Sequence, residues 1–292
     1  MLLALVVSCN TEPKTAVQKK VDSYALVKIE SPDLSGITDN GKEVLNLYKF
    51  AADQADSIYW KQCFGDKMLV ENLKDADLKE YAKINYGPWD RLDGKAFIDG
   101  FGAESPLGAN FYPKDMTTAE FESMDDPVKT SPYSLIRRGA DGRLTSVWYH
   151  DAFEYNIDKI CNYLKAAADI TIKPSVRNYL LKKIDALKTD YYYDSDLAWL
   201  EMTDSKMDLI IGPNEVNDDQ LYGLKTSYRL MCSSRISNVP RSSTSSSRCF
   251  LSSRSRSHVR ISTRHSYLAT SLTSTPTMPS TAQATPTPAS SL

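Results

Sequence analysis

Apolar residues recur three or four positions apart after residue 40, which is the spacing of an amphipathic helix. This helix is expected to begin near Lys42 behind a cap at Asp39 or Asn40, and to end at Gly65. Asp56 falls on its polar face. The side chains expected to face the core are Val44, Leu47, Tyr48, Ala51, Ala55 and Ile58.

Three further stretches show the same helical period. One covers 67–85 with an expected break at 75–77, one covers 153–168, and one begins at Pro174 and continues to 187. Their expected inward side chains are Leu69, Leu73, Tyr81 and Ile84 in the first, Phe153, Ile157, Ile160, Leu164 and Ala168 in the second, and Val176, Leu180, Ile184 and Leu187 in the third.

Strand signals are fewer and lie among the helices. Residues 133–138 and 143–149 flank a glycine-bounded four-residue turn, which predicts an antiparallel hairpin. Residues 208–212 predict a buried strand that runs into a turn. Thr117 and Glu120 have the spacing of a capping box for a short helix. No strand–helix–strand alternation occurs, so the pattern predicts a helix-rich α+β fold.

Charge is distributed unevenly along the 292 residues. Residues 229–292 contain eight arginines, no lysine and no acidic residue, so residues 1–228 hold 27 basic side chains and all 37 acidic ones. The first part therefore has a net charge of about −10 and offers no basic stripe for phosphates. We expect it not to bind nucleic acid.

The segment 229–292 is rich in serine, threonine, arginine and proline and has no apolar period, which predicts disorder. It could be a linker, an arginine/serine tail for nucleic acid, or the product of a shifted reading frame. We prefer the third interpretation. Restoring one G after codon 228 turns the next seven residues into Glu-Ala-Tyr-Val-Leu-Ile-Lys, which fits a helix. A one-base deletion near codon 229 is therefore expected.

The chain begins with an apolar run that ends in Val6-Val7-Ser8-Cys9. This ending is similar to a bacterial lipobox, in which Cys9 would be lipidated after cleavage, although the usual basic segment before the run is missing. The alternative is a short buried strand. Residues 1–22 are thus expected to be a signal remnant and polar tether, and the protein to be lipid-anchored or periplasmic in a bacterial cell envelope.

Motifs for metal or nucleophilic chemistry are missing from the sequence. The five cysteines form no CxxC pair, and the three histidines, His150, His258 and His265, form no HExxH motif. GxSxG, Walker A and GxGxxG motifs are also missing. His150 follows the hairpin and is expected to be a hydrogen-bonded structural residue. We therefore predict no metal-binding and no catalytic residue in this chain.

Two groups of acidic residues need separate interpretation. Asp90, Asp93 and Asp99 lie in one loop and are expected to be solvated, as is usual in an acidic protein. Glu215 instead follows the buried strand and its Gly-Pro turn, so it could point into a cleft. A carboxylate there can pair with a cationic amino group. The alternative is an exposed loop glutamate.

Six segments occur in an order that resembles the N-terminal part of peptidase family M49, the dipeptidyl peptidase III family, in its Bacteroidetes-type branch. The resemblance covers residues 23–228. The segments are LSGITDNGKEVLNLY (34–48), INYGPWDR (84–91), SLIRR (134–138), VWYHD (147–151), KMDLIIGP (206–213) and DQLYGLK (219–225).

The resemblance implies a two-lobed protein with a wide cleft, one lobe being mixed α/β around a β-barrel and the other helical and zinc-binding. It implies a zinc-dependent enzyme that removes dipeptides from the free N-termini of oligopeptides. Zinc in that family is held by an HExxH-type helix and a later glutamate, which would lie beyond residue 292. This chain is therefore expected to be an inactive fragment.

The resemblance also implies a substrate-binding element within this chain. In the family a Glu-x-Tyr after the strand helps to hold the peptide amino terminus and carbonyl. Glu215 matches the acid, whereas Asn217 stands in place of the tyrosine, which weakens the expected support for the carbonyl. Two other functions stay open: a non-enzymatic peptide-binding module that keeps Glu215 in a cleft, and a gene remnant without a role.

Overall fold

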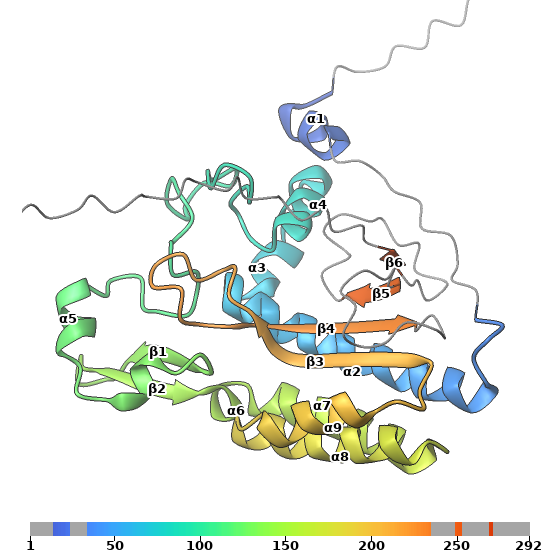
Figure 1. The fold of residues 1–292 in the computed structure, drawn as a ribbon. Coiled ribbons are helices and arrows are strands. Elements are labelled where there is room, and N and C mark those ends of the chain that lie inside the picture. The colour runs from blue at the N-terminus through green and yellow to red at the C-terminus, as the bar shows by residue number, and fades with distance from the viewer. Residues whose placement is uncertain (1–13, 24–33, 235–248, 253–268, 271–292) are drawn as a thin grey trace, which may run out of the picture.

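The computed structural model describes residues 14–23, 34–234, 249–252 and 269–270 (Figure 1). Cys9, with the expected lipobox around it, lies outside the described residues. The predicted helix-rich α+β class is confirmed. The expectation of a β-barrel is wrong for the described part of the chain, because its strands form two small open sheets.

The helices in chain order are α1 (Ala16–Ser23), α2 (Asp39–Cys63), α3 (Lys67–Glu71), α4 (Ala76–Asn85), α5 (Thr118–Ser123), the 3₁₀ helix η1 (Pro127–Thr130), α6 (Tyr149–Ala152), α7 (Glu154–Ile170), α8 (Pro174–Thr189) and α9 (Tyr193–Glu201). The strands are β1 (Ser134–Arg138), β2 (Leu144–Trp148), β3 (Met207–Glu215), β4 (Ser227–Ser234), β5 (Cys249–Ser252) and β6 (Ala269–Thr270). β1 and β2 form the predicted antiparallel hairpin, and β3, β4, β5 and β6 pair in that order in a second antiparallel sheet.

The main core lies where α2 packs against α7 and against β4, with α8 and α9 stacked beyond α7 (Figure 1). The apolar stripes of α2, α7 and α8 supply most of its side chains, as their helical period predicts. A smaller cluster joins the end of α2 to α3 and α4. None of the helices that the structure describes is both long enough and apolar enough to cross a membrane.

The start of α2 differs from the prediction. Thr38 is the cap, and its hydroxyl accepts a hydrogen bond from the backbone N–H of Gly41 at 3.2 Å. Asp39 is already helical, while the amide of Asn40 donates instead to the carbonyl of Ile170 at 2.7 Å. Asn40 therefore ties α2 to the end of α7, and this long-range contact removes it from the capping position.

Two predicted side-chain orientations, one on α2 and one on α3, are wrong. Asp56 is buried rather than exposed, because the hydroxyl of Tyr86 donates to its carboxylate at 2.8 Å. Leu69 is 48% exposed, whereas its neighbour Val70 is 2% exposed and packs in the smaller cluster. The predicted break is present, but it covers 72–75 rather than 75–77, and the side chain of Asp75 caps α4. One continuous helical period across 67–85 therefore does not hold.

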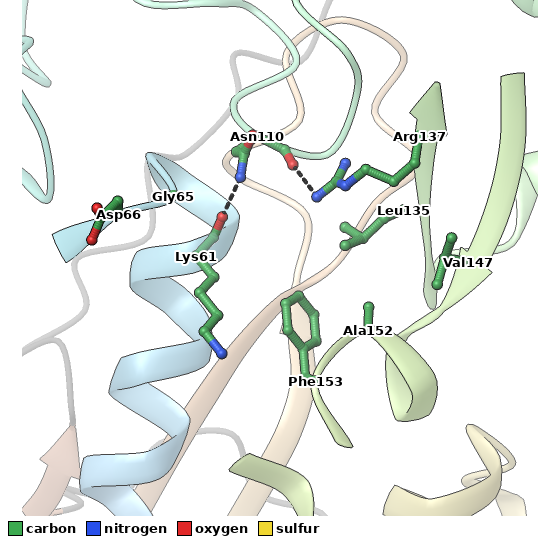
Figure 2. Close-up of a pocket in the computed structure, with 9 residues that line it drawn as sticks. All are labelled: Lys61, Gly65, Asp66, Asn110, Leu135, Arg137, Val147, Ala152 and Phe153. Carbon is green, nitrogen blue, oxygen red and sulfur yellow. Dashed lines mark hydrogen bonds between the residues drawn. The ribbon is translucent and has the colours of Figure 1, made fainter. Parts of the chain in front are cut away.

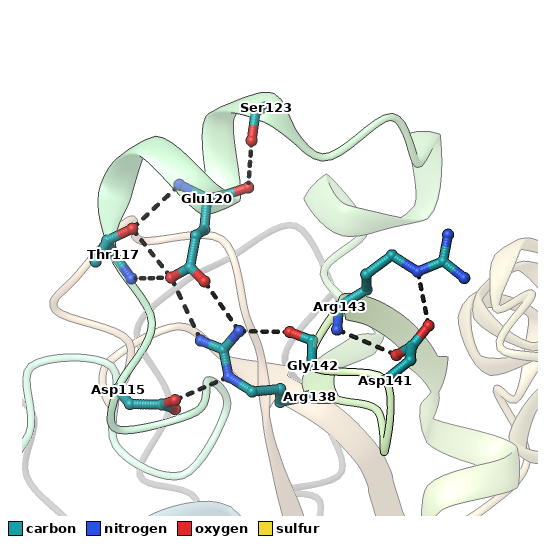
Figure 3. Close-up of polar contacts among 8 residues, drawn as sticks. All are labelled: Asp115, Thr117, Glu120, Ser123, Arg138, Asp141, Gly142 and Arg143. Atoms are coloured by element: carbon teal, nitrogen blue, oxygen red, sulfur yellow. Dashed lines mark hydrogen bonds and ion pairs between the residues drawn. The ribbon is translucent and has the colours of Figure 1, made fainter.

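The capping box of α5 is confirmed (Figure 3). Thr117 accepts from the backbone N–H of Glu120 at 3.2 Å, and the carboxylate of Glu120 accepts from the backbone N–H of Thr117 at 2.8 Å. Arg138 on β1 pairs with Glu120 at 2.9 Å and with Asp115 at 2.8 Å. The cap therefore also fastens α5 to the hairpin.

β4 continues to Ser234, six residues beyond the point where composition changes. Tyr228, Leu230 and Cys232 are buried against the core, while Arg229 and Met231 between them are partly exposed. This alternation is that of a half-buried strand. The structure thus places a strand at 229–234, where the sequence predicted disorder and the restored reading frame predicted a helix.

Candidate functional site

The site lies where β3 ends. A bulge in the pairing of β3 with β4 falls between Pro213 and Glu215, and bulges redirect the side chains beside them. Gly212 precedes the bulge with φ of +131°, and a side chain there would meet the ring of Tyr192 at 3.4 Å. The Gly-Pro pair thus allows β3 to pass close to Tyr192 before the strand ends at Glu215.

Glu215 is held by two side chains of its own protein. One carboxylate oxygen accepts from Arg229 on β4, and the other accepts from the amide of Asn217 at 2.6 Å. The side chain of Glu215 is 24% exposed and that of Arg229 is 18% exposed. Glu215 is therefore not a free loop glutamate. Its expected cationic partner, an amino group, is replaced here by a guanidinium group of the same chain.

The next carboxylate along the chain, Asp218, is the centre of a buried polar cluster. It is ion-paired with Arg91, and it accepts from the hydroxyl of Tyr59 at 3.0 Å and from that of Ser227 at 2.6 Å. These partners come from the loop after α4, from α2 and from β4. The cluster therefore fixes the loop that carries Asn217 against three separate elements.

A polar cavity of about 420 Å³ adjoins this cluster. Asn217 and Asp218 line it on one side, and the loops 85–94 and 104–109 line it on the other. The cavity is lined by two segments that carry the family resemblance, 84–91 and, through Gln220, 219–225. Glu215 is not among its lining residues.

Asp90 lines the same cavity and is not the solvated carboxylate that the sequence predicted. The hydroxyl of Tyr81 and the ammonium of Lys20 each donate to it at 2.7 Å, and the backbone N–H of Leu92 donates at 2.9 Å. Burial alone would raise the pKa of Asp90, but these donors outweigh burial and hold its pKa below the ordinary value. Asp90 is therefore a charged anchor of the loop.

His150 has the structural role expected of it. Its backbone N–H and its Nδ1 both meet one carboxylate oxygen of Asp190, at 3.0 Å and 2.8 Å. Burial raises the pKa of Asp190, against the effect of these contacts. Within the described ranges, no three His, Cys, Asp or Glu residues are grouped so that they could hold a metal ion. The donor set of this region does not fit a catalytic zinc ion.

The chain is similar to solved structures of dipeptidyl peptidase III and to a curated plant sequence. The structure of DPP III from Caldithrix abyssi superposes with a TM-score of 0.69 and 33% identity, covering 75% of this chain and 44% of that one. Dipeptidyl-peptidase III from Corallococcus sp. strain EGB gives a TM-score of 0.69 and 27% identity, covering 75% and 43%. The resemblance to the dipeptidyl peptidase III family, M49, is confirmed. The match is consistent with an N-terminal portion of that family.

The chain is also similar to a curated plant protein and covers only part of that protein's length. Nudix hydrolase 3 of Arabidopsis thaliana is 27% identical over 75% of this chain and 36% of its own length. No protein-family model matches the chain. The chain therefore spans less than half the length of the dipeptidyl peptidase III structures and of the curated relative that it matches.

Some residues of this region were not found from sequence. Arg91 stands in a segment that carries the resemblance, yet nothing in its spacing links it to Asp218, 127 positions later. Arg229 belongs to the segment expected to be disordered, so its contact with Glu215 was missed. The period-two alternation of Tyr228, Leu230 and Cys232 was the signal that could have extended the strand.

Proposed function

We propose that this chain is the part of a dipeptidyl peptidase III-type protein that recognises the amino terminus of an oligopeptide, and that Glu215 binds the ammonium group. The position of Glu215 supports the proposal. It ends β3 beside a bulge, within a fold shared with dipeptidyl peptidase III over 75% of the chain. A partly buried carboxylate is a strong acceptor for an ammonium group, because its charge is incompletely screened by water.

Arg229 and Asn217 determine how this carboxylate can act. Arg229 donates to the first oxygen of Glu215, so a peptide ammonium placed there competes with the guanidinium for the carboxylate. Asn217 donates an amide hydrogen to the second oxygen and orients the carboxylate. An amide is a weaker acid than the family's phenol, so Asn217 gives a substrate carbonyl less support than tyrosine would.

Zinc-dependent hydrolysis finds no support in the side chains of the described residues. The single histidine among them, His150, is engaged with Asp190, and no suitable cluster of donors lies near Glu215. We propose that the 292-residue polypeptide binds peptides without cleaving them. This separates it from the zinc-dependent activity that the family resemblance implies.

A dipeptidyl-arylamide assay with added zinc tests whether the polypeptide cleaves peptides. The expected result is no turnover with or without a chelator. Turnover that zinc supports and a chelator removes would contradict the proposal. A melting curve by circular dichroism on the same sample distinguishes a folded binding module, which unfolds cooperatively, from a gene remnant without a stable fold.

A one-base deletion near codon 229 stays a proposal, and the burial pattern of β4 bears on it. The restored frame places alanine at position 230, valine at position 232 and leucine at position 233, the three described positions that β4 buries after Tyr228. Both frames therefore suit a strand. Sequencing the genomic DNA across codon 229 tests the deletion, and a read that keeps the serine/arginine segment in phase would end it.

Lipid anchoring at Cys9 also stays a proposal, based on the lipobox-like start. The full chain expressed in a bacterium with lipoprotein processing is expected to partition into the detergent phase, and Cys9→Ser is expected to abolish this. Equal partitioning of the two proteins would contradict the lipid anchor.

A further inference from the structure

A second cavity, of about 450 Å³, lies between the end of α2, the β1–β2 hairpin and the start of α7 (Figure 2). It shares no lining residue with the polar cavity beside Asp218. Nothing in the proposed recognition of a peptide amino terminus uses it. Its walls combine apolar side chains with two cations, Lys61 and Arg137.

The apolar part of the wall comes from the hairpin and from the junction of α6 and α7. Leu135 and Phe153 are each 3% exposed, and Val147 and Ala152 beside them are half-buried. Figure 2 shows these four side chains facing the space between α2 and the hairpin. Such a surface favours an apolar group of a ligand over water.

Arg137 supplies the first cation. Its guanidinium donates to the carbonyls of Ile136 at 2.8 Å, Asn110 at 3.0 Å and Phe111 at 3.2 Å. Among the residues that the structure describes, Arg137 forms no ion pair. The next residue, Arg138, is paired with two carboxylates. Carbonyl dipoles thus hold the guanidinium of Arg137 in place without neutralising its charge.

A half-buried cation without a counter-charge is unfavourable. Burial lowers the pKa of Arg137, which reflects this cost. The guanidinium has five N–H donors, and its three carbonyl bonds leave two of them for another acceptor. A bound anion would both neutralise the charge and satisfy these donors.

Lys61 and Asp66 set the remaining charge of the wall. The ammonium of Lys61 donates to the amide oxygen of Asn156 at 2.7 Å, which is a neutral partner. Asp66 is the one acid in the lining, and it caps α3 by accepting from the backbone N–H of Met68 at 2.8 Å. With Arg137 included, the lining carries two positive charges and one negative charge.

We propose that this cavity binds a small organic carboxylate that carries an apolar group. The carboxylate lies on the guanidinium of Arg137, whose planar fork matches its two oxygens, and the apolar group packs on Leu135 and Phe153. A phosphate shares the anion chemistry but makes no use of the apolar wall. The assignment is independent of the proposed role of Glu215.

Calorimetry on the full chain with N-acetyl-L-phenylalanine as the probe tests the proposal. The uncharged N-acetyl-L-phenylalanine amide and inorganic phosphate are the comparison ligands. We expect the carboxylate to bind about tenfold or more tightly than either, because a hydrogen-bonded charge is lost in the amide and the apolar contact is lost in phosphate. Arg137→Gln is expected to weaken carboxylate binding about tenfold or more.

Arg143→Gln is the matched control, because Arg143 lies in the same hairpin and its side chain is 85% exposed. Ala152→Phe fills the cavity without altering the guanidinium and is also expected to abolish binding, so the test does not depend on the folding of one variant. Melting curves accompany each variant. Failure of the wild type to bind the probe, equal binding of phosphate, or unchanged binding in Ala152→Phe would overturn the proposal.

Discussion

Replacing Arg229 by glutamine is the sharpest perturbation of the proposed ammonium site. Arg229 donates to one oxygen of Glu215, so an incoming amino terminus competes with it for the carboxylate. Hydrogen bonds to charged groups contribute about 1.5–3 kcal/mol, and the partial exposure of this pair favours the lower end. A gain of about 1.4 kcal/mol corresponds to tenfold in affinity. We therefore expect Arg229→Gln to bind a peptide amino terminus about tenfold more tightly than the wild type.

Fluorescence anisotropy with a short peptide labelled at its C-terminus measures this gain. The same peptide with an acetylated amino terminus is expected to show no gain, because it has no ammonium group to place on Glu215. Arg143→Gln again provides a control for the loss of one positive charge, since its side chain is 85% exposed. Unchanged or weaker binding by Arg229→Gln would refute the competition between Arg229 and the peptide.

Three predictions concern stability. Ile160→Ala is expected to lower the free energy of unfolding by about 2–5 kcal/mol in urea titrations, because Ile160 is fully buried, whereas Ile172→Ala, at a residue 67% exposed, should change it by less than about 0.5 kcal/mol. Glu120→Gln is expected to lower the melting temperature at neutral pH, because the wild-type carboxylate pairs with Arg138. Arg138 chiefly lowers the pKa of Glu120 from 4.5 to about 2. The stabilisation is therefore present above pH 4.5 and is lost as the pH falls through about 2, where the melting temperatures of the two proteins should converge. Burial lowers the pKa of Lys225 from 10.5 to about 8, so the folded protein disfavours its charged form. The wild type should therefore gain stability as the pH rises from 8 to 10.5. Lys225→Met should lack this rise, and an equal rise in both proteins would contradict the assignment.

The long helices could be predicted because their apolar period is fixed by the core that they cover. α2, α7 and α8 were found in this way, and the hairpin was found from its turn. α9 was missed because its apolar side chains do not form an inward stripe: Tyr193, Leu197 and Leu200 are all exposed. The cap of α2 was misplaced because Asn40 bonds to α7, a contact that local sequence does not encode.

The candidate site shows the same division between local and long-range determinants. Glu215 could be singled out because the sequence predicts a buried strand just before it, although the expected Gly-Pro turn is a bulged continuation of β3. Its pairing with Arg229 depends on the register of β3 with β4, which is set by tertiary structure across an intervening loop. The lowered pKa of Asp90 likewise depends in part on Lys20, which is 70 positions away.

Glu215 is proposed to recognise the free amino terminus of a peptide. Calorimetry with one peptide in its free and N-acetylated forms, on the wild type and on Glu215→Gln, tests this role. Glu43→Gln, at an exposed residue of α2, is the control for loss of one negative charge. We predict that the wild type and Glu43→Gln bind the free form about tenfold more tightly than the acetylated form, and that Glu215→Gln does not distinguish them. Equal affinity of the wild type for both forms, or a preference that persists in Glu215→Gln, would contradict the claim.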